Sequence, residues 1–390
     1  MGDTGAGRRG TGGGCGVRDK KPGALPAGFM VYFALALALF QQDSYDDVAE
    51  QLVGGVPELS ASIPNKSSFT RARRRLGPQV LESLFRELAG PLASVGPEGS
   101  FYRGMRLAAV DGFVLDAPDT KANRAAFGGP TKNSWPAGFP QVRVVTLTEC
   151  GTHAQIDAAV GGFSGGEPEL AIKTADSAAG MLVIMDRGFP RVALWKAYTG
   201  AGAHLLVRAR SSVAARPVEH LPDGTYLARM SLAGQRASHP GGVPVRVIEY
   251  RVDGGEVVRL LTDLLDPTAY PAMELARLYH ARWEAESAFR QIKTFQRGPA
   301  QVLRSADPET GAAGGLGAPG RAPLPHAGHH VLGRGQRYRS RQGLVRQSAQ
   351  AHPAQRGPSV RGHTQEDQEV PGRTGSEGAP QARQRHQAHA

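Results

Sequence analysis

Four polar residues at helical spacing lie in the segment from Leu275 to Phe295, and their types could act on a phosphodiester. If the segment is one helix of about 100° per residue, Tyr279, Arg282, Glu286 and Lys293 lie at roughly 0°, 300°, 340° and 320°, on a narrow stripe beside an apolar face. A carboxylate flanked by cations suits a metal-dependent phosphodiester site, because the metal takes hard oxygen ligands and the polyanion binds Arg and Lys. The alternative is an ordinary solvated helix face.

Two aspartates that follow apolar segments could complete such a site. The segment MRLAAVDGFVLD predicts a strand that ends at Asp111, a turn at Gly112 and then a second strand. The run MLVIM at 181–185 is continuously apolar, as in a strand buried in the middle of a sheet, and it ends on Asp186. Together with Glu286, these aspartates are the three candidate catalytic carboxylates.

Converging carboxylates are the ligands that a two-metal mechanism needs, with the metals about 3.5–4 Å apart. Magnesium fits because it takes few protein carboxylates and keeps water and phosphate oxygens in its shell, and Mn²⁺ is a possible substitute. We therefore expect Asp111, Asp186 and Glu286 to be metal ligands. Simpler explanations exist for the aspartates: Asp111 could be a turn former with Asp116 and Asp119 as nearby rivals, and Asp186 could cap a helix.

The charge of the chain is unevenly distributed along its 390 residues. The formal net charge is +11, but residues 310–390 contain 11 Arg, no Lys and four acidic residues, a net charge of +7, which leaves +4 for the first 309 residues. Global basicity is therefore weak support for nucleic-acid binding, and local clusters have to carry that argument. The two cysteines, Cys15 and Cys150, provide neither a zinc site nor a disulfide framework, so a reducing cytoplasm is the expected compartment.

The first 95 residues predict a disordered segment followed by a small helical domain. Residues 1–28 are rich in Gly and Arg and lack periodicity. The apolar run at 29–40 is too short to span a membrane and predicts a buried helix, and Ser44 is a candidate N-cap for the next helix.

An arginine-rich helix follows in this domain. We expect Ser67 or Ser68 to cap it, Gly77 to end it and Pro78 to begin another helix, whose inward residues would be Val80, Leu81, Leu84, Phe85 and Leu88. Helix, glycine turn and helix fit a DNA-binding unit of helix-turn-helix character. The candidate DNA contacts are Arg71, Arg73, Arg74 and Arg75, and a merely solvated face is the alternative.

After a linker at 91–100, strands and helices alternate up to about residue 210, which predicts an α/β sheet with carboxylates at strand ends. Residues 211–265 contain strand patterns alone and predict a hairpin-rich β insertion. From Thr310 onward there is no Ile, Phe, Met, Trp, Cys, Lys or Asn, so the tail is expected to be disordered. An out-of-frame translation after about Asp307 explains this abrupt change better than a natural basic tail, and its seven histidines then reflect composition rather than a metal site.

These motifs resemble the DDE transposases of the insertion-sequence-four family. Its Y-x2-R-x3-E-x6-K signature is matched without a spacing error by Tyr279, Arg282, Glu286 and Lys293, and the first and second acidic blocks are matched by AAVDGFVLDAPDTKANRAAFG and VIMDRGF. The resemblance covers about Leu25 to Asp307.

The resemblance implies a fold class, a site and partners. The fold would be α/β, a ribonuclease-H-like catalytic core at 101–300 with a β-rich insertion at about 211–265, preceded by a helical DNA-binding domain at 29–95 and followed by the tail. Tyr279, Arg282 and Lys293 would hold phosphates of double-stranded DNA at the transposon end, and the insertion would help to grip a DNA hairpin. The partners would be terminal inverted repeats and target DNA, bound by a homodimer in the synaptic complex of a bacterial, nucleoid-associated protein with no membrane contact.

Three functions remain open at this point. The leading one is cut-and-paste transposition, in a product inactivated by the frameshift. The second is a non-catalytic remnant that occupies transposon ends through Arg71 to Arg75. The third is a metal-dependent nuclease that hydrolyses DNA but does not join it.

Overall fold

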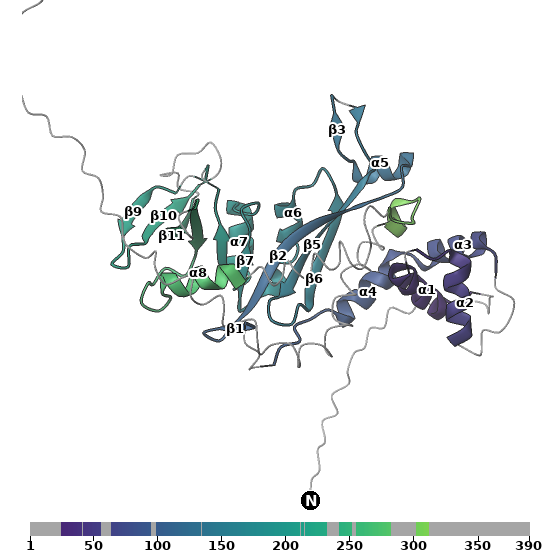
Figure 1. Cartoon of the computed structure of the whole chain (residues 1–390), viewed down its shortest axis with the longest axis horizontal. Coiled ribbons are helices and arrows are strands. Elements are labelled where there is room, and N and C mark those ends of the chain that lie inside the picture. Colours follow the sequence, from purple (N-terminus) through teal and green to yellow (C-terminus); the bar gives the residue numbers. More distant parts are fainter. Residues whose placement is uncertain are drawn as a thin grey trace, which may run out of the picture. The chain divides into compact units, whose positions relative to one another are not determined.

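The computed structural model describes residues 25–40, 42–55, 64–94, 99–133, 135–210, 212–213, 215–231, 242–251, 255–281 and 302–311 (Figure 1). All of them belong to the first of two compact units, Met1–Ala349 and Gln350–Ala390. Three expected residues of the long helix, Arg282, Glu286 and Lys293, lie outside the described residues, as do the expected disorder of residues 1–24 and of the tail. In the described part of the chain, no helix has the length and apolar character that crossing a bilayer requires.

Three helices near the N-terminus pack around aromatic side chains. They are α1 (Ala27–Leu39), α2 (Tyr45–Gly55) and α3 (Lys66–Leu76). The rings of Phe33 and Phe69 stack at a centroid distance of 4.5 Å, and Tyr45 meets Phe33 edge-on at 5.6 Å. The predicted cap at Ser44 is confirmed, because its Oγ accepts from the Asp47 N–H at 3.1 Å and the Asp47 carboxylate accepts from the Ser44 N–H at 2.9 Å.

The prediction for the start of α3 was wrong by two or three residues. Asn65 is the N-cap, and its side-chain oxygen accepts from the Ser68 N–H at 3.0 Å, so Ser67 and Ser68 lie in the first turn. Asn is as good an N-cap as Ser, so the helix is capped by Asn65, which comes before both serines in the sequence.

Gly77 separates α3 from α4 (Pro78–Leu88) with a φ of 73°, as expected for a glycine that ends a helix. The predicted inward face of α4 is correct for Phe85, which is buried, but wrong for Leu88, which is 72% exposed. Leu88 is the last residue of the helix, so its side chain extends past the contacts that bury Phe85.

A ten-stranded mixed sheet forms the centre of the described chain. Its strand order is β6-β5-β2-β7-β8-β12-β11-β10-β9, with β1 paired to β2 outside this path. The strands are β1 (Phe101–Tyr102), β2 (Met105–Asp116), β5 (Gln141–Glu149), β6 (Gln155–Gly162), β7 (Met181–Met185), β8 (His204–Arg208), β9 (Pro217–His220), β10 (Tyr226–Met230), β11 (Val243–Arg251) and β12 (Val257–Thr262).

The middle of this sheet is parallel and its flanks are antiparallel. β7 pairs in parallel with both β2 and β8, whereas β5 and β6 on one side and β12 to β9 on the other are antiparallel. The predicted central strand at 181–185 is confirmed, since every residue of β7 is buried. The predicted β segment at 211–265 supplies strands β9 to β12, which continue the same sheet through the pairing of β12 with β8.

The predicted turn at Gly112 was wrong. β2 runs through Gly112 without a break, and Gly112 pairs with Val145 of β5. The glycine leaves room for a neighbouring side chain, because a Cβ at this position would lie 2.9 Å from Cγ and Cδ of Glu167. The glycine therefore marks a close approach between a strand and a side chain, which is a known use of glycine inside a strand.

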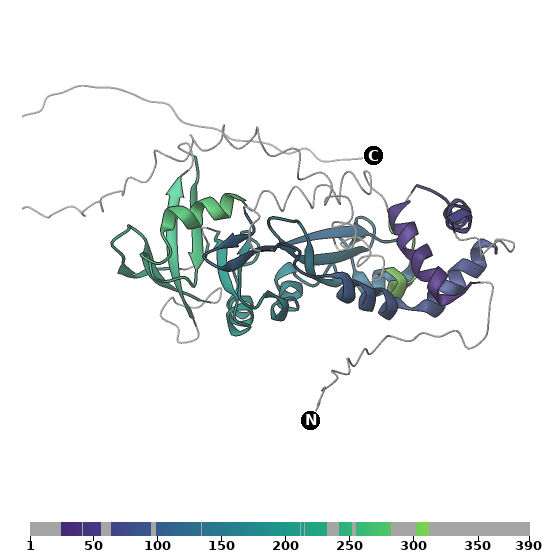
Figure 2. The same cartoon turned by 90° about the horizontal axis from the view of Figure 1, so that it is seen from below.

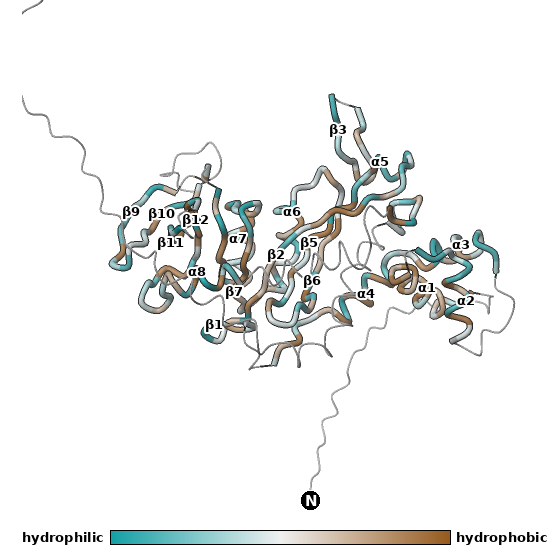
Figure 3. Tube along the Cα trace, in the orientation of Figure 1, coloured by the Kyte–Doolittle hydropathy of each residue, from teal (hydrophilic) through white to brown (hydrophobic). Residues whose placement is uncertain are grey.

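Helices cover both faces of the sheet. On one face, α6 (Glu167–Ile172) and α7 (Val192–Gly200) pack on a cluster that includes Val110, Met185 and Trp195. On the other face, α8 (Ala272–Ala281) packs through Leu275 and Tyr279 on a cluster that includes Leu107, Ala109, Leu182 and Ile184. Figure 2 shows α8 lying across the strands, and Figure 3 shows apolar residues concentrated in the central strands and in α1.

Residues 302–311 pack beside the end of β2 and α5 (Lys121–Phe127). The Leu303 N–H donates to the Asp116 carbonyl at 2.7 Å, and the side-chain amide of Asn123 donates to the Ser305 carbonyl at 3.0 Å. A helical turn starts at Pro308, and the Asp307 carboxylate accepts from the Thr310 N–H at 3.0 Å. Asp307 is thus the N-cap of a helix, with proline in the favoured first position.

Candidate active site and nucleic-acid interface

Asp111 and Asp186 lie on neighbouring strands and face the same side of the sheet. β2 and β7 are parallel, and the register ends with Val110 opposite Met185, so the two aspartates follow in equivalent positions. Successive side chains of a strand alternate between faces. Leu107 and Ala109 pack on the α8 side, as do Leu182 and Ile184, which assigns Asp111 and Asp186 to that side as well. With strands about 4.8 Å apart, both carboxylates can reach one cation.

A hydrogen bond from Tyr279 of α8 confirms that the Asp186 side chain points to the α8 side of the sheet. The Tyr279 hydroxyl donates to Oδ1 of Asp186 at 3.2 Å, and the tyrosine is 4% exposed. Two residues that the sequence placed 93 positions apart therefore meet in the structure, because α8 packs on the face toward which Asp186 points. Oδ1 of Asp111 accepts from the adjacent Gly112 N–H at 2.8 Å.

Arg208 is a candidate site residue that the sequence reasoning missed. It follows Val207, which is opposite Met185 in the parallel register, so it takes the same position on β8 that Asp186 takes after β7. Its guanidinium donates to the Glu256 carboxylate at 3.5 Å, and its side chain is 26% exposed. The sequence contained one signal: the run HLLVR ends on a charged residue after three apolar residues, as MLVIMD does after five.

Arg208 also influences two titratable groups near α8. Burial lowers the pKa of His280, and the positive charge of Arg208 lowers it further. Burial raises the pKa of the Tyr250 phenol, as does the nearby Tyr279 phenol, while Arg208 opposes the shift. The Tyr250 hydroxyl and Nε2 of His280 are 3.3 Å apart. Burial and the positive charge of Arg208 therefore both favour a neutral imidazole at His280.

Asp116 and Asp119, the two other aspartates near Asp111 in the sequence, make contacts away from the candidate site. Asp116 lies on the opposite face of β2 from Asp111 by strand alternation, and its Oδ1 accepts from the Gln141 side-chain amide at 2.9 Å. Asp119 accepts from the Arg124 guanidinium at 2.6 Å, and this hydrogen bond holds the pKa of the Asp119 carboxyl below its ordinary value. The capping alternative for Asp186 fails, because α7 begins only at Val192.

The donor chemistry of this pair fits a hard divalent cation. Two carboxylates offer oxygen ligands, one within β2 and one directly after β7, and magnesium is bound by few carboxylates with water and phosphate completing its shell. Among the described residues, no group of three or more His, Cys, Asp or Glu side chains could hold a metal ion. The third expected ligand, Glu286, lies outside the described residues, so the described chain contributes two of the three expected carboxylates.

The four arginines of α3 differ in their surroundings. Arg73 is half-buried, donates to the Tyr45 hydroxyl and stands 5.9 Å above that ring, and Arg75 donates to the Leu25 carbonyl at 2.8 Å. These contacts hold the helices of the domain together. Arg71 is exposed, with a 3.4 Å contact to the Ser68 hydroxyl, and Arg74 is exposed with a 3.3 Å ion pair to Asp307.

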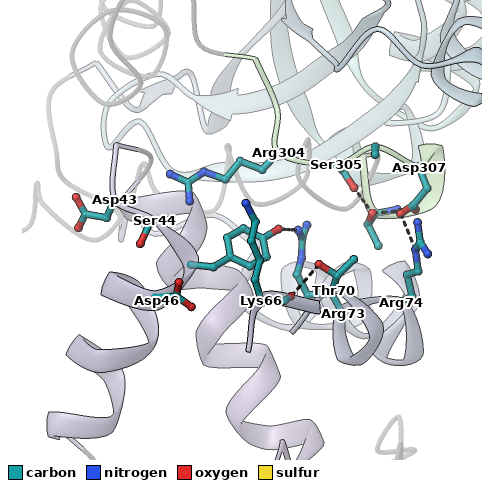
Figure 4. A pocket seen from close by; sticks show the side chains of 13 residues that line it. Asp43, Ser44, Asp46, Lys66, Thr70, Arg73, Arg74, Arg304, Ser305 and Asp307 are labelled. Atoms are coloured by element: carbon teal, nitrogen blue, oxygen red, sulfur yellow. Dashed lines mark hydrogen bonds and ion pairs between the residues drawn. The ribbon is translucent and has the colours of Figure 1, made fainter. Parts of the chain in front are cut away.

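A cavity of about 540 Å³ lies between the starts of α2 and α3 and the segment 304–310 (Figure 4). Four cationic side chains line it: Lys66, Arg73, Arg74 and Arg304. Three carboxylates, Asp43, Asp46 and Asp307, line it as well, so the cavity is mixed in charge rather than a simple anion site. The Arg304 guanidinium donates to the Phe40 carbonyl at 3.4 Å across this cavity.

Comparison with known proteins identifies two family regions. Residues 102–310 match the family described as transposase DDE domain, and residues 13–86 match the family described as insertion element 4 transposase N-terminal. The second match begins before Leu25, where the sequence resemblance was expected to start.

One relative aligns over most of the chain. It is the transposase InsG for insertion sequence element IS4 of Escherichia coli (strain K12), which is 30% identical over 292 residues, covering 73% of this chain and 65% of the relative. The chain thus spans slightly less than two thirds of that relative. Among solved structures, a piggyBac transposase synaptic complex with hairpin DNA aligns with a TM-score of 0.44 and 13% identity, over 78% of this chain and 67% of that one.

Proposed function

The chain belongs to the insertion sequence 4 family of DDE transposases, and we propose that it cleaves and joins DNA at the ends of its own insertion sequence. The observation that carries this proposal is the placement of Asp111 and Asp186 in equivalent positions on two parallel strands, facing one side of the sheet. Both aspartates, with Glu286, would hold Mg²⁺. The metal ions would activate the attacking oxygen and stabilise the leaving oxygen of a phosphodiester.

Glu286 reaches this site if α8 continues beyond its described end at Ala281. Glu286 lies seven residues after Tyr279, which corresponds to about 340° around a helix, nearly the same face. Tyr279 contacts Asp186, so a residue two turns further along that face of a continuous helix would face the same side of the sheet as Asp111 and Asp186. Arg282 and Lys293 share this stripe and would bind the phosphates on either side of the cleaved bond.

Tyr279 and Arg208 have separate roles in this proposal. The Tyr279 hydroxyl holds one oxygen of Asp186 and leaves the other for the metal, which fixes the orientation of the ligand. Arg208 flanks Asp186 on the far side from Asp111 and would bind a phosphate oxygen of the DNA. Its contact with Glu256 is long, at 3.5 Å, so the guanidinium can exchange this partner for a phosphate.

The arrangement of five strands supports a ribonuclease-H-like core. In the order β6-β5-β2-β7-β8, the first three strands are antiparallel neighbours in a meander, and the last two are added in parallel with helices in their connections. The candidate ligands stand where the parallel pairing of β2 with β7 ends, directly after Val110 and Met185, and Asp186 follows the carboxyl end of β7, the usual place for sites in such sheets.

The partner we propose is double-stranded DNA, first the terminal inverted repeats and then the target, bound by two copies of the chain. The N-terminal helical domain would contact it through Arg71 and Arg74, two exposed arginines of α3 whose contacts are long, at 3.4 and 3.3 Å, whereas the exposed Arg75 makes a 2.8 Å hydrogen bond. Arg73 and Arg75 support the domain instead.

We further propose that a frameshift near codon 307 has inactivated this product. The family match ends at Thr310, and the structure shows a capped helix beginning at Pro308. The 80 residues after Thr310 contain no Ile, Phe, Met or Trp, so they offer no apolar face with which to continue such a helix. Translation of the downstream nucleotides in the other two frames should restore an apolar helical pattern.

The test compares the chain with a frame-repaired version on DNA that carries the ends of the element. With Mg²⁺, the repaired protein should nick and join these ends, and the chain as it stands should do neither. The Asp186→Asn change in the repaired protein should abolish both steps while DNA binding persists. Nicking without joining would instead favour a hydrolytic nuclease, and retention of activity by the Asp186→Asn variant would refute the proposed site.

A second candidate function is occupation of transposon ends without catalysis. It is favoured by the N-terminal domain, which has its own core around Phe33 and Phe69 and matches its own family. Binding of the ends by the unrepaired chain in the presence of a chelator, with affinity falling steeply as salt rises, would support it.

A further inference from the structure

A two-stranded ribbon separate from the central sheet carries the most exposed large apolar side chain in the described residues. Its strands are β3 (Thr131–Lys132) and β4 (Trp135–Pro136), and all four of their residues are exposed. Trp135 is 76% exposed. Figure 1 shows the ribbon projecting from the body of the chain beyond α5.

The base of the ribbon is firmly held. The Ala137 N–H donates to the Pro130 carbonyl at 2.9 Å, and the Gln141 N–H donates to the Gly128 carbonyl at 3.0 Å. The Arg124 guanidinium, which is paired with Asp119, also donates to the Gly138 carbonyl at 3.1 Å. An isolated two-stranded hairpin is marginally stable. These contacts keep the ribbon extended although no core covers it.

Lys132 and Trp135 stand directly opposite each other in the ribbon. Opposite residues of an antiparallel pair point to the same face, with their Cβ atoms about 5 Å apart. The ribbon therefore presents an ammonium group and an indole side by side. This pair suits duplex DNA, because the indole can make apolar contact with base edges in the major groove, such as the thymine methyl, while the ammonium binds a neighbouring phosphate. A two-stranded ribbon also has the width of the DNA major groove.

The ribbon is close enough to the active site to meet the same DNA. Its base is joined to the end of β2, because the Ala117 N–H donates to the Pro140 carbonyl at 2.7 Å. Asp111 lies six residues before Ala117 on this extended segment, about 20 Å from the base, and Trp135 lies five residues before Pro140, at most about 17 Å from the base. The largest separation is therefore about 37 Å, roughly one turn of duplex.

We propose that the β3–β4 ribbon binds the duplex beside the cleavage site, with Trp135 against the bases and Lys132 on a phosphate. This inference rests on the proposed function, since it names an additional surface for the same DNA. It assigns a role to residues that lie outside every motif of the family signature.

The experiment measures affinity and tryptophan accessibility with the full chain in a chelator, so that no cleavage occurs. The probe is a duplex of about 40 base pairs of arbitrary sequence, roughly four turns. Trp135→Ala should weaken binding about tenfold, through loss of the contact between the indole and the base edges, and Lys132→Ala should weaken it a few-fold and reduce its salt dependence. A matched control for Lys132, Lys196→Ala at an exposed position of α7, should bind as the parent does.

A spectroscopic readout separates direct contact of the indole from an indirect effect. The chain has three tryptophans, so Trp283 is first replaced by Phe. In this background DNA should protect the chain from acrylamide quenching, and the further change Trp135→Phe should remove the protection, because the remaining Trp195 is buried and contributes little to quenching. Equal affinities of the parent and Trp135→Ala would overturn the ribbon inference and leave the proposed function intact. Failure of the parent to bind any duplex would overturn both. Conversion of a dimer to a monomer by Trp135→Ala, with DNA affinity unchanged, would make the ribbon a protein contact and also overturn the inference.

Discussion

Replacing Gly112 by alanine should destabilise the chain through one identifiable contact. The added Cβ would lie 2.9 Å from Cγ and Cδ of Glu167 and 3.0 Å from its Oε1, closer than real Cβ atoms come to such neighbours. Glu167 cannot withdraw as a unit, because α6 is anchored by buried Pro168, Leu170 and Ala171. The side chain must therefore change rotamer, or β2 must shift beside Asp111.

Inserting a carbon into a packed site usually costs about 1–3 kcal/mol. Glu167 is partly exposed and can rotate toward solvent, so we expect the lower half of that range, about 1–2 kcal/mol. For a domain of 150–250 residues this corresponds to a melting temperature lower by about 2–8 °C. As a control, Gly54→Ala adds a methyl group in α2 where no atom lies within 4 Å, and it should be neutral or stabilising.

A double-mutant cycle measured by urea unfolding tests the cause. If the contact with Glu167 is responsible, Glu167→Ala in the Gly112→Ala background should recover at least half of the lost free energy of unfolding. Additive effects of the two changes would show that Glu167 is not the obstacle. An unaltered stability of the single Gly112→Ala variant would refute the close approach itself.

Three further changes test other parts of the structure. Glu149→Gln should cost about 3 kcal/mol in urea unfolding, because this fully buried carboxylate pairs with Arg106 and accepts from two backbone N–H groups, and its loss leaves the Arg106 cation without an anionic partner. A cost below about 1 kcal/mol would contradict this explanation. The lowered pKa of His280 means that the unfolded chain binds this proton more readily than the folded chain, so stability should fall as pH drops below about 6.5, and His280→Gln should flatten that slope in urea midpoints. In the repaired protein, Arg208→Ala should slow DNA cleavage by about 100-fold and Arg208→Lys should restore part of the rate, whereas equal rates for all three would exclude a phosphate-binding role.

The sequence alone predicted those features that depend on local pattern. The apolar run at 181–185 predicted the buried strand β7, and Ser44 with Asp47 predicted the start of α2. The family resemblance, which rests on motif spacing, is confirmed by the match at 102–310.

Features that depend on distant contacts were not predictable in the same way. Gly112 looked like a turn because the Glu167 side chain that requires it is 55 residues away in sequence. Arg208 was missed because its relation to Asp186 is set by the register of β7 and β8, which no local pattern reveals. The arginines of α3 looked equivalent in sequence, and only packing against Tyr45 and Leu25 separates Arg73 and Arg75 from the other two.

Binding of Mn²⁺ to the full chain, followed by electron paramagnetic resonance, tests most directly whether Asp111 and Asp186 form one metal site. Asp116→Asn is the matched control, because Asp116 lies on the same strand but on the opposite face. We expect the parent and Asp116→Asn to bind Mn²⁺ alike, and Asp111→Asn and Asp186→Asn each to lose at least about tenfold in affinity, the loss that even outer-shell partners of a metal produce. Unchanged Mn²⁺ binding by Asp111→Asn or Asp186→Asn would contradict a shared metal site.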